Sequence, residues 1–315
     1  MIDPSNTAIA INGLKKSFEE TEAVRGVNLT ISKGEMFGLV GPDGAGKTTL
    51  IRMLCGILVP TEGNATILGY DLATELNSIK PKIGYLSQRF SLYPDLSIDE
   101  NIEFFAEIHE VKGYEARRNE LLEFTRLTPF RDRLADKLSG GMKQKLALAA
   151  TLIHKPEIIF LDEPTTGVDP VSRREFWKIL SSLLEEGITI LMATPYLDEA
   201  ERCSRVGLMS NGQILLADTP QQVKRQMKGS VLEVIPSNLN KATDTLKKYS
   251  EVIEVQTFGD RINVVVEGNV AADTLTGWLS KAGVETKMIR NIQPSLENVF
   301  IALLRERSEE EPAHA

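Results

Sequence analysis

The sequence predicts an α/β domain built on a mainly parallel sheet, followed by a smaller domain that also mixes helices and strands. In the first two-thirds of the chain, short apolar runs alternate with helical patterns, which is typical of α/β proteins. The apolar runs are nearly continuous, as expected for parallel strands covered on both faces. After residue 225 the pattern changes to strands and helices in the order βαββαβ.

The first domain is expected to span residues 1–225. Its core strands are predicted at 36–40, 82–87, 157–162 and 188–193. Apolar residues recur at helical spacing over 48–58, which predicts a helix after the first strand. Residues 98–153 are mostly helical in pattern. We therefore expect an inserted helical subdomain over about 92–153.

The second domain is expected to span residues 226–308 and to have a ferredoxin-like α+β fold, because its elements follow the βαββαβ order. The predicted strands and helices lie at 230–236, 239–249, 252–259, 261–268, 270–283 and 284–290. An amphipathic helix follows over 295–307. The acidic residues 309–315 are expected to form a disordered tail.

Composition narrows the function classes. A net charge of −8 argues against a broad nucleic-acid surface, so we expect no nucleic-acid partner. Cys55 and Cys203 lack metal-binding spacing, which favours buried thiols in a reducing cytosol. No apolar run approaches the roughly 18 residues of a membrane span. Residues 1–11 lack the pattern of a signal peptide, so any membrane role is expected to work through a partner.

A phosphate-binding loop is predicted at "GPDGAGKTT", which fits the pattern GxxxxGK[ST] between a strand and a helix. Its residues are Gly41, Pro42, Asp43, Gly44, Ala45, Gly46, Lys47, Thr48 and Thr49. Glycines let backbone N–H groups turn towards phosphate oxygens, and the helix N-terminus adds its dipole. Lys47 is expected to bridge the β- and γ-phosphates of a nucleotide, and the Thr48 hydroxyl to bind Mg²⁺.

Two carboxylates at the end of "IIFLDEP" supply the second half of this site. Neighbouring strand residues point to opposite faces, so Asp162 can face Mg²⁺ while Glu163 faces the attacking water. Ligands bind at this edge of α/β sheets. Gln88, at the end of another predicted strand, adds a polar group at the same edge as a catalytic and metal-binding candidate.

A second anion-binding helix start occurs at "LSGGM", where Ser139, Gly140 and Gly141 open a helical pattern. With this motif, residues 8–220 resemble the ATP-binding subunits of ABC transporters. The resemblance implies a P-loop NTPase fold: a RecA-like core with an antiparallel edge sheet and a helical insert. It also implies a head-to-tail dimer, in which each ATP lies between the phosphate loop of one chain and the LSGGM motif of the other.

Two further residues gain roles from the resemblance. Phe18 aligns with the aromatic that stacks on adenine, although a lone aromatic at this place is also compatible with packing in an edge strand. Asp169 matches the loop that contacts the partner's ATP site, and its alternative is an ordinary loop aspartate before a proline. Asp43 departs from the asparagine common in the family's phosphate loop.

The stretches "YLSQRFSLYPDLSIDENIEFFA" and "QPSLENVF" resemble the bacterial exporter branch that pairs with separate membrane permeases and includes drug-resistance exporters. This implies an ATPase subunit at the cytoplasmic face of the inner (plasma) membrane, as a homo- or heterodimer, with residues 89–101 in the permease-docking groove. The C-terminal domain's task stays open between dimer support and regulation. Two alternatives stay open: a non-transport ATPase acting on ribosomes or DNA, and a slowly hydrolysing ATP switch.

Pro195 motivates the second alternative. The family usually has a histidine there that hydrogen-bonds the γ-phosphate, whereas proline has no side-chain donor and no N–H. None of the three histidines, His109, His154 and His314, is placed by the sequence to substitute. Because the other motifs are intact, we expect Glu163-dependent hydrolysis to persist.

Overall fold

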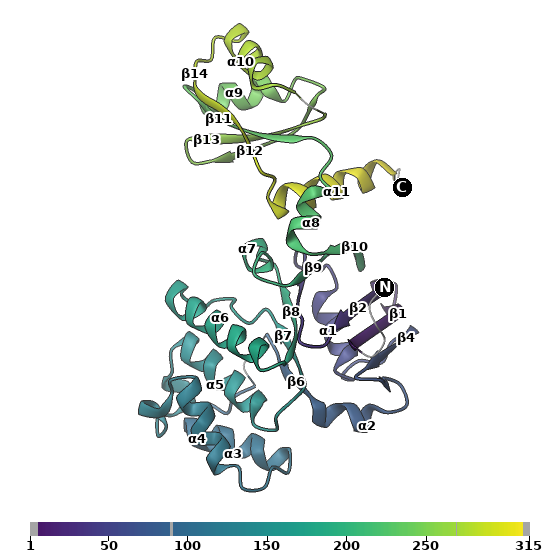
Figure 1. Ribbon diagram of the computed structural model, residues 1–315, viewed down its shortest axis with the longest axis vertical. Helices are drawn as coiled ribbons and strands as arrows, with labels where there is room; N and C mark the ends of the chain where they lie inside the picture. Colours follow the sequence, from purple (N-terminus) through teal and green to yellow (C-terminus); the bar gives the residue numbers. More distant parts are fainter. Residues whose placement is uncertain (1–5, 89–90, 269, 311–315) are drawn as a thin grey trace. The chain divides into compact units, whose positions relative to one another are not determined.

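The computed structural model describes residues 6–88, 91–268 and 270–310 (Figure 1). The chain divides into two compact units, Met1–Ala217 and Asp218–Ala315. The sequence placed this boundary after residue 225. Helix α8 (Pro220–Arg225) belongs instead to the second unit, because it contacts α11 (Leu296–Glu310).

A six-stranded sheet forms the centre of the first unit, in the order β10-β9-β3-β8-β7-β6. Its strands are β3 (Met36–Val40), β6 (Ile83–Leu86), β7 (Ile158–Asp162), β8 (Thr189–Thr194), β9 (Arg205–Ser210) and β10 (Gln213–Asp218). The pairs β9-β3, β3-β8, β8-β7 and β7-β6 are parallel. Every residue of β3, β7 and β8 is buried, so the predicted doubly covered parallel sheet is confirmed.

An antiparallel sheet in the order β2-β1-β4-β5 accompanies it. Its strands are β1 (Thr7–Phe18), β2 (Thr21–Ser32), β4 (Glu62–Ile67) and β5 (Tyr70–Asp71). Helix α1 (Lys47–Leu54) shares one buried core with both sheets, which includes Leu50 and Met53. The helix ends earlier than predicted, because Gly56 adopts a left-handed φ of 67° that terminates a helix.

The predicted helical insert lies on the far side of the parallel sheet from the antiparallel sheet (Figure 1). Its helices are α3 (Ile98–Ile108), α4 (Glu115–Phe124) and α5 (Gly140–Leu152), with short 3₁₀ turns at Thr128–Phe130 and Ala135–Lys137. A capping box starts α3: the Ser97 hydroxyl accepts from the Glu100 N–H, and the Glu100 carboxylate accepts from the Ser97 N–H. The remaining helices of this unit are α2 (Leu76–Ile79), the 3₁₀ turn Lys80–Lys82, α6 (Pro170–Glu185) and α7 (Leu197–Ala200).

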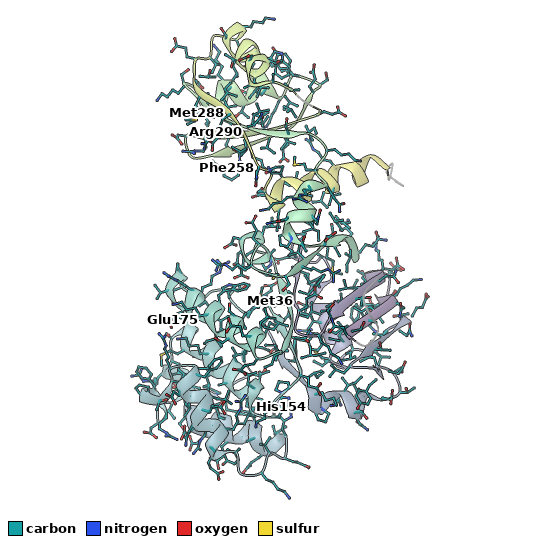
Figure 2. The ribbon with its side chains drawn as sticks, in the orientation of Figure 1. Met36, His154, Glu175, Phe258, Met288 and Arg290 are labelled. Carbon is teal, nitrogen blue, oxygen red and sulfur yellow. The ribbon has the colours of Figure 1, made fainter. Side chains whose placement is uncertain are left out.

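The second unit has the predicted βαββαβ order, and its antiparallel sheet β12-β13-β11-β14 has ferredoxin-like topology. Its elements are β11 (Ser230–Pro236), α9 (Leu239–Leu246), β12 (Val252–Phe258), β13 (Arg261–Val266), α10 (Ala272–Lys281) and β14 (Thr286–Ile292). Leu246 and Leu279 of the helices pack with Val264 of the sheet in a separate core. The buried Glu233 is held by Arg261 and Arg290, the latter labelled in Figure 2.

Three sequence-based expectations concern the rest of the chain. Cys55 and Cys203 are buried free thiols, as predicted. We expected a disordered tail from residue 309. Helix α11 instead continues to Glu310, so the first two positions of that tail are helical. Residues 311–315 lie outside the described residues. Within the described ranges, no helix combines the length and apolarity needed to cross a membrane.

Candidate functional site

The loop of residues 41–49 joins the end of β3 to the start of α1. Gly46 precedes α1 with a φ of 100°, and a Cβ there would come within 2.3 Å of the Ala23 carbonyl oxygen. A Cβ on Gly41 would come within 2.1 Å of the Met209 carbonyl oxygen. Only glycine fits these two positions. Because the first N–H groups of a helix lack partners inside it, the loop can present donors to an anion.

Lys47, the first residue of α1, is held over this loop. Its side chain is 4% exposed, and its Nζ donates to the carbonyl oxygens of Gly41 at 2.7 Å and Pro42 at 2.9 Å. The same Nζ lies 3.7 Å from Glu163 Oε1. A buried ammonium needs such partners, and a bound phosphate could replace them with stronger charge-assisted bonds.

Asp162 ends β7 and is fully buried. Its Oδ1 accepts a hydrogen bond from Thr48 Oγ1 at 2.8 Å, and its Oδ2 accepts one from Tyr85 Oη at 3.3 Å. Burial, together with the nearby charge of Asp162, raises the pKa of Tyr85 to about 12, against an opposing influence of Arg52. The Thr48 hydroxyl and the Asp162 carboxylate thus lie side by side, as the sequence led us to expect.

Glu163 follows at once, in a backbone conformation that L-residues rarely adopt, with a φ of 51°. Its N–H donates to the Ala193 carbonyl oxygen of the neighbouring strand at 2.9 Å. Its Oε2 accepts from Gln88 Nε2 at 2.9 Å and from Thr166 Oγ1 at 3.4 Å. Such outliers cluster at functional sites, where surrounding contacts hold them in place.

A cavity of about 430 Å³ is shared by residues 43–49 of the phosphate loop, Gln88 and Glu163, whereas Asp162 does not line it. It is lined by Phe18, Ala23, Asp43, Gly44, Ala45, Gly46, Lys47, Thr48, Thr49, Gln88 and Glu163. Phe18 is 43% exposed at the end of β1, so it is no core aromatic, and the Lys16 Nζ lies 5.1 Å from its ring centre. Asp43 is exposed.

The LSGGM residues do not line this cavity. Ser139 caps α5 by accepting a hydrogen bond from the Met142 N–H, and Ser139 and Gly140 are exposed. Gly141 is buried against α6: a Cβ there would come within 2.3 Å of Ser172. Asp169, also exposed, caps α6 by accepting from the N–H groups of Val171 and Ser172. The LSGGM motif and the phosphate loop of one chain therefore do not form a common site.

The expected docking segment 89–101 is described from residue 91 onwards; Arg89 lies outside the described residues. Asn101 is fully buried, and its side chain holds the loop through the backbone of Tyr93, Leu96 and Ser97. The Tyr93 ring packs on Phe104 with centroids 4.3 Å apart, yet the residue stays 45% exposed.

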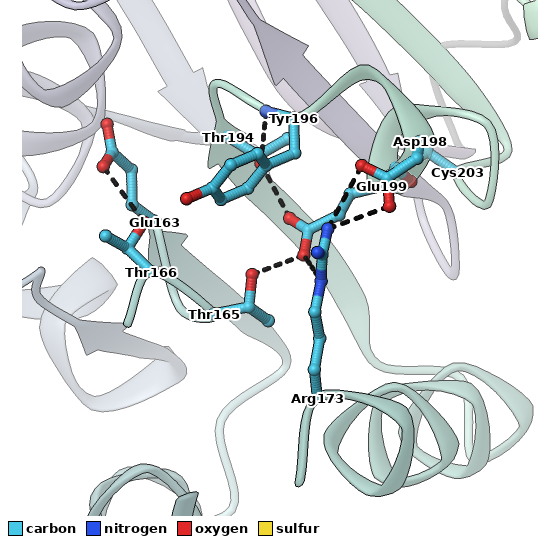
Figure 3. A network of polar contacts seen from close by, with 9 residues as sticks. All are labelled: Glu163, Thr165, Thr166, Arg173, Thr194, Tyr196, Asp198, Glu199 and Cys203. Atoms are coloured by element: carbon cyan, nitrogen blue, oxygen red, sulfur yellow. Dashed lines mark hydrogen bonds and ion pairs between the residues drawn. The ribbon is translucent and has the colours of Figure 1, made fainter. Parts of the chain in front are cut away.

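A polar network beside Pro195, drawn in Figure 3, was not predicted from the sequence. Its centre is Glu199, which accepts hydrogen bonds from Thr165, Arg173 and Thr194. Tyr85, the partner of Asp162, was missed in the same way. An acidic residue one turn after a buried strand, at a position where an amphipathic helix should bury apolar residues, is the signal that could have pointed to Glu199.

Two family models match the chain. The model "ABC transporter" matches residues 24–166, and "ATP-binding protein DrrA1-3-like, C-terminal domain" matches residues 219–304. The first match covers the phosphate loop, Gln88, the LSGGM motif and the two carboxylates. The second covers nearly all of the second compact unit.

Relatives extend the likeness over the whole chain. The probable multidrug ABC transporter ATP-binding protein YbhF of Escherichia coli (strain K12) is 42% identical over 307 residues, which cover 95% of this chain and 52% of that protein. The chain thus spans about half the length of that relative. The daunorubicin resistance ATP-binding protein DrrA2 of Streptomyces coeruleorubidus is 34% identical over 310 residues, which cover 96% of each chain.

Solved structures match about two-thirds of the chain. The dimeric bacterial ABC transporter cassette MJ0796 has a TM-score of 0.62 at 29% identity, covering 67% of this chain and 98% of that one. The subunit cbiO1 from Clostridium perfringens, part of the ABC transporter complex cbiONQ, has a TM-score of 0.65 at 28% identity, covering 70% and 92%. The family models, the relatives and the solved structures thus all point to an ABC transporter ATP-binding subunit.

Proposed function

Because the chain belongs to the family of ABC transporter ATP-binding subunits, we propose that it binds and hydrolyses ATP to energise a transmembrane exporter. The observation that carries this proposal is the cavity in which the phosphate loop, Lys47, Gln88 and Glu163 meet. Each group has a chemical task in phosphoryl transfer, and the proposal is supported by the fact that all of them line one cavity.

ATP would lie with its phosphates on the loop and its base near Phe18. The loop offers N–H donors and the positive end of the α1 dipole, both of which favour an anion. Lys47 would exchange its two carbonyl contacts for phosphate oxygens. The exposed face of Phe18 offers a stacking surface to adenine.

The donor set beside the phosphates fits Mg²⁺. Thr48 and Asp162 present oxygen ligands, and a hydrogen bond of 2.8 Å already keeps them adjacent. Gln88 uses its amide nitrogen on Glu163, so its amide oxygen is the atom that remains for a cation. Such sites commonly use one or two carboxylates together with substrate phosphates. When bound, Mg²⁺ would neutralise charge on the phosphate oxygens.

We assign to Glu163 the role of activating the attacking water molecule. Its carboxylate is 8% exposed, close to Lys47, and hydrogen-bonded to Gln88. In this position it can orient a water molecule and accept its proton. Preorganised groups of this kind act without reorganisation during the reaction, which is why they accelerate it.

Each ATP would be completed by a second ATP-binding subunit, identical or related. Support comes from the exposure of Ser139, Gly140 and Asp169, which lie away from the cavity of their own chain. The N-terminus of α5 can bind an anion, and it does not line the cavity formed by the phosphate loop of the same chain. The solved structure of the related cassette MJ0796 is dimeric.

The exporter role rests on the relatives, whose names refer to a multidrug ABC transporter and to daunorubicin resistance. We assign the permease contact to the segment 91–101, where the exposed Tyr93 offers an apolar anchor. The chain would then act peripherally, at the cytoplasmic face of the membrane. A net charge of −8 gives no support to a nucleic-acid partner.

Thermal melting of the full chain with Mg-ATP tests the binding step. At a free ligand concentration about 100 times its dissociation constant, folding should gain roughly 2.7 kcal/mol, and the melting temperature should rise. Chelating Mg²⁺ should reduce the shift, and Lys47→Ala should remove most of it. Lys137→Ala is a matched control, because that lysine is a surface residue paired with Asp136. No shift in the parent protein, together with no detectable ATP binding, contradicts the proposal.

A further inference from the structure

Glu199 is a fully buried carboxylate whose two oxygens both have partners. Its Oε1 accepts from Thr165 Oγ1 and, at 2.7 Å, from Arg173 Nε; its Oε2 accepts from Thr194 Oγ1 at 2.7 Å (Figure 3). A buried charge is costly unless it is paired and hydrogen-bonded in this way. We call Glu199 with Thr165, Arg173 and Thr194 the Glu199 clamp.

The clamp ties together the two loops that leave adjacent strands of the parallel sheet. Thr165 lies two residues after Glu163, in the loop after β7, and is buried. Thr194 ends β8, immediately before Pro195, and also accepts a hydrogen bond from the Tyr196 N–H at 3.0 Å. A single carboxylate therefore links the loop that carries Glu163 to the loop that carries Pro195.

Arg173 extends the clamp to helix α6. Its guanidinium donates to Asp198 at 3.1 Å as well as to Glu199, and its Cζ lies 4.9 Å from the centre of the Tyr196 ring. Asp169 is the N-cap of the same helix. A shift of the clamp would therefore reach both the Glu163 backbone and the start of α6.

We propose that Glu199 is a positioning residue for ATP hydrolysis, acting through Thr165 and Thr194 to hold the backbone of Glu163. The inference rests on the proposed function. Glu163 keeps an unfavourable φ of 51°, and such a conformation persists only where the surroundings over-determine it. Its side chain is fixed by Gln88 and Lys47, whereas Thr165 anchors the chain that follows it. Because rate depends steeply on the position of the reacting groups, loosening that anchor should slow the chemical step.

Thr165→Val tests the clamp most cleanly, because valine keeps the volume of threonine but cannot donate to Glu199. We expect kcat for ATP to fall by about tenfold or more, from the loss of a hydrogen bond to a charged acceptor. The KM for ATP should stay within about twofold, since the clamp does not line the cavity. Thr165→Ser, which keeps the hydroxyl, should restore most of the turnover. Thr194→Val and Thr194→Ser repeat the comparison at the other arm.

Thr125→Val is the matched control. Thr125 is also fully buried and donates through Oγ1, but to the Leu121 carbonyl oxygen in the helical insert. Its substitution should leave kcat unchanged. Unchanged kcat in Thr165→Val, an equal loss in Thr165→Val and Thr165→Ser, or a change in KM alone would each overturn the inference.

Hydrogen exchange of the full chain supplies a readout that needs no turnover. Peptides covering 163–168 and 194–199 should exchange faster in Thr165→Val than in Thr165→Ser, while peptides of the second unit stay unchanged. A parent protein without ATP turnover would contradict the proposed function. In that case, faster exchange in these two segments still supports the clamp, and equal exchange in the two variants overturns it.

Discussion

At the residue scale, Glu163 is the residue to which we assign the chemistry, and its surroundings fit that role. The carboxylate has Gln88 at 2.9 Å and Lys47 at 3.7 Å, while the backbone N–H is fixed to β8 at 2.9 Å. The unusual φ of 51° costs about 1 to 3 kcal/mol, which packing elsewhere must offset. Both the side chain and the backbone of Glu163 are thus fixed by contacts with other residues of the chain.

Pro195 follows the last residue of the neighbouring strand β8, where the family usually has a histidine. It has no N–H, and the hydrogen bond at the strand end runs from the Tyr196 N–H to Thr194 Oγ1 instead. A family histidine at this position would add one charge-assisted hydrogen bond to the γ-phosphate. Such a bond is worth about 1.5 to 3 kcal/mol, or roughly ten- to 150-fold in rate if it forms only in the transition state.

We therefore predict that Pro195→His keeps or raises the steady-state ATP turnover of the permease complex, by at most that factor. Pro195→Ala serves as the control: it also lacks a side-chain donor, so its turnover should stay near that of the parent. Loss of turnover in Pro195→His with intact nucleotide binding would show that this loop cannot accept an imidazole, and would contradict the prediction.

At the scale of elements, two stacked histidines join the ends of α3 and α5. The rings of His109 and His154 lie 3.9 Å apart at an angle of 9°, and His154 Nε2 lies 2.9 Å from the Ile83 carbonyl oxygen of β6 (His154 is labelled in Figure 2). Burial, helped by the charge of His109, lowers the pKa of His154 to about 4, and burial also lowers the pKa of His109. Both rings are therefore neutral in the folded protein near neutral pH.

A lowered pKa in the folded state makes stability depend on pH. The stabilisation is complete above the ordinary histidine pKa of about 6.5 and is lost as the pH falls towards about 4, because the unfolded chain takes up protons first. We predict that protonation of His154 lowers the free energy of unfolding by on the order of 2 kcal/mol over this range, after allowing for the partial exposure of the ring. Urea unfolding of the parent and of His154→Phe, measured between pH 7 and 4.5, checks this. Parallel pH profiles for the two proteins would contradict it.

The elements also show how far the sequence could be interpreted. Apolar runs and helical spacing predicted the core strands and the βαββαβ unit, because these patterns follow directly from burial. The proximity of the phosphate loop to Asp162 and Glu163 was predictable, because the motifs have a fixed spacing and the strands end at one edge of the sheet. The Glu199 clamp was not, because Thr165, Arg173 and Glu199 lie far apart in the sequence and only tertiary packing brings them together.

At the scale of the whole molecule, each unit has its own buried core. One core is built from β1, β2, α1 and the parallel sheet, and the other from β11, β13, α9 and α10. Units of this kind can fold independently. We predict that residues 1–218 alone unfold cooperatively and bind Mg-ATP. Thermal unfolding followed by circular dichroism and an ATP titration are the measurements. A truncated protein that is monomeric and unfolds cooperatively but binds no nucleotide would contradict this prediction.

ATP turnover by the complex with the proposed permease, compared between the parent and Glu163→Gln, tests the central claim most directly. Glutamine keeps the size of the side chain but removes the base, so turnover should fall by about 100- to 10,000-fold while ATP still binds and the dimer stays closed. Glu120→Gln is the control, because Glu120 is exposed on α4 and pairs with Arg117. Turnover at the parent rate in Glu163→Gln, or none above background in the parent, would contradict the assignment of this chain as an ATPase that works through Glu163.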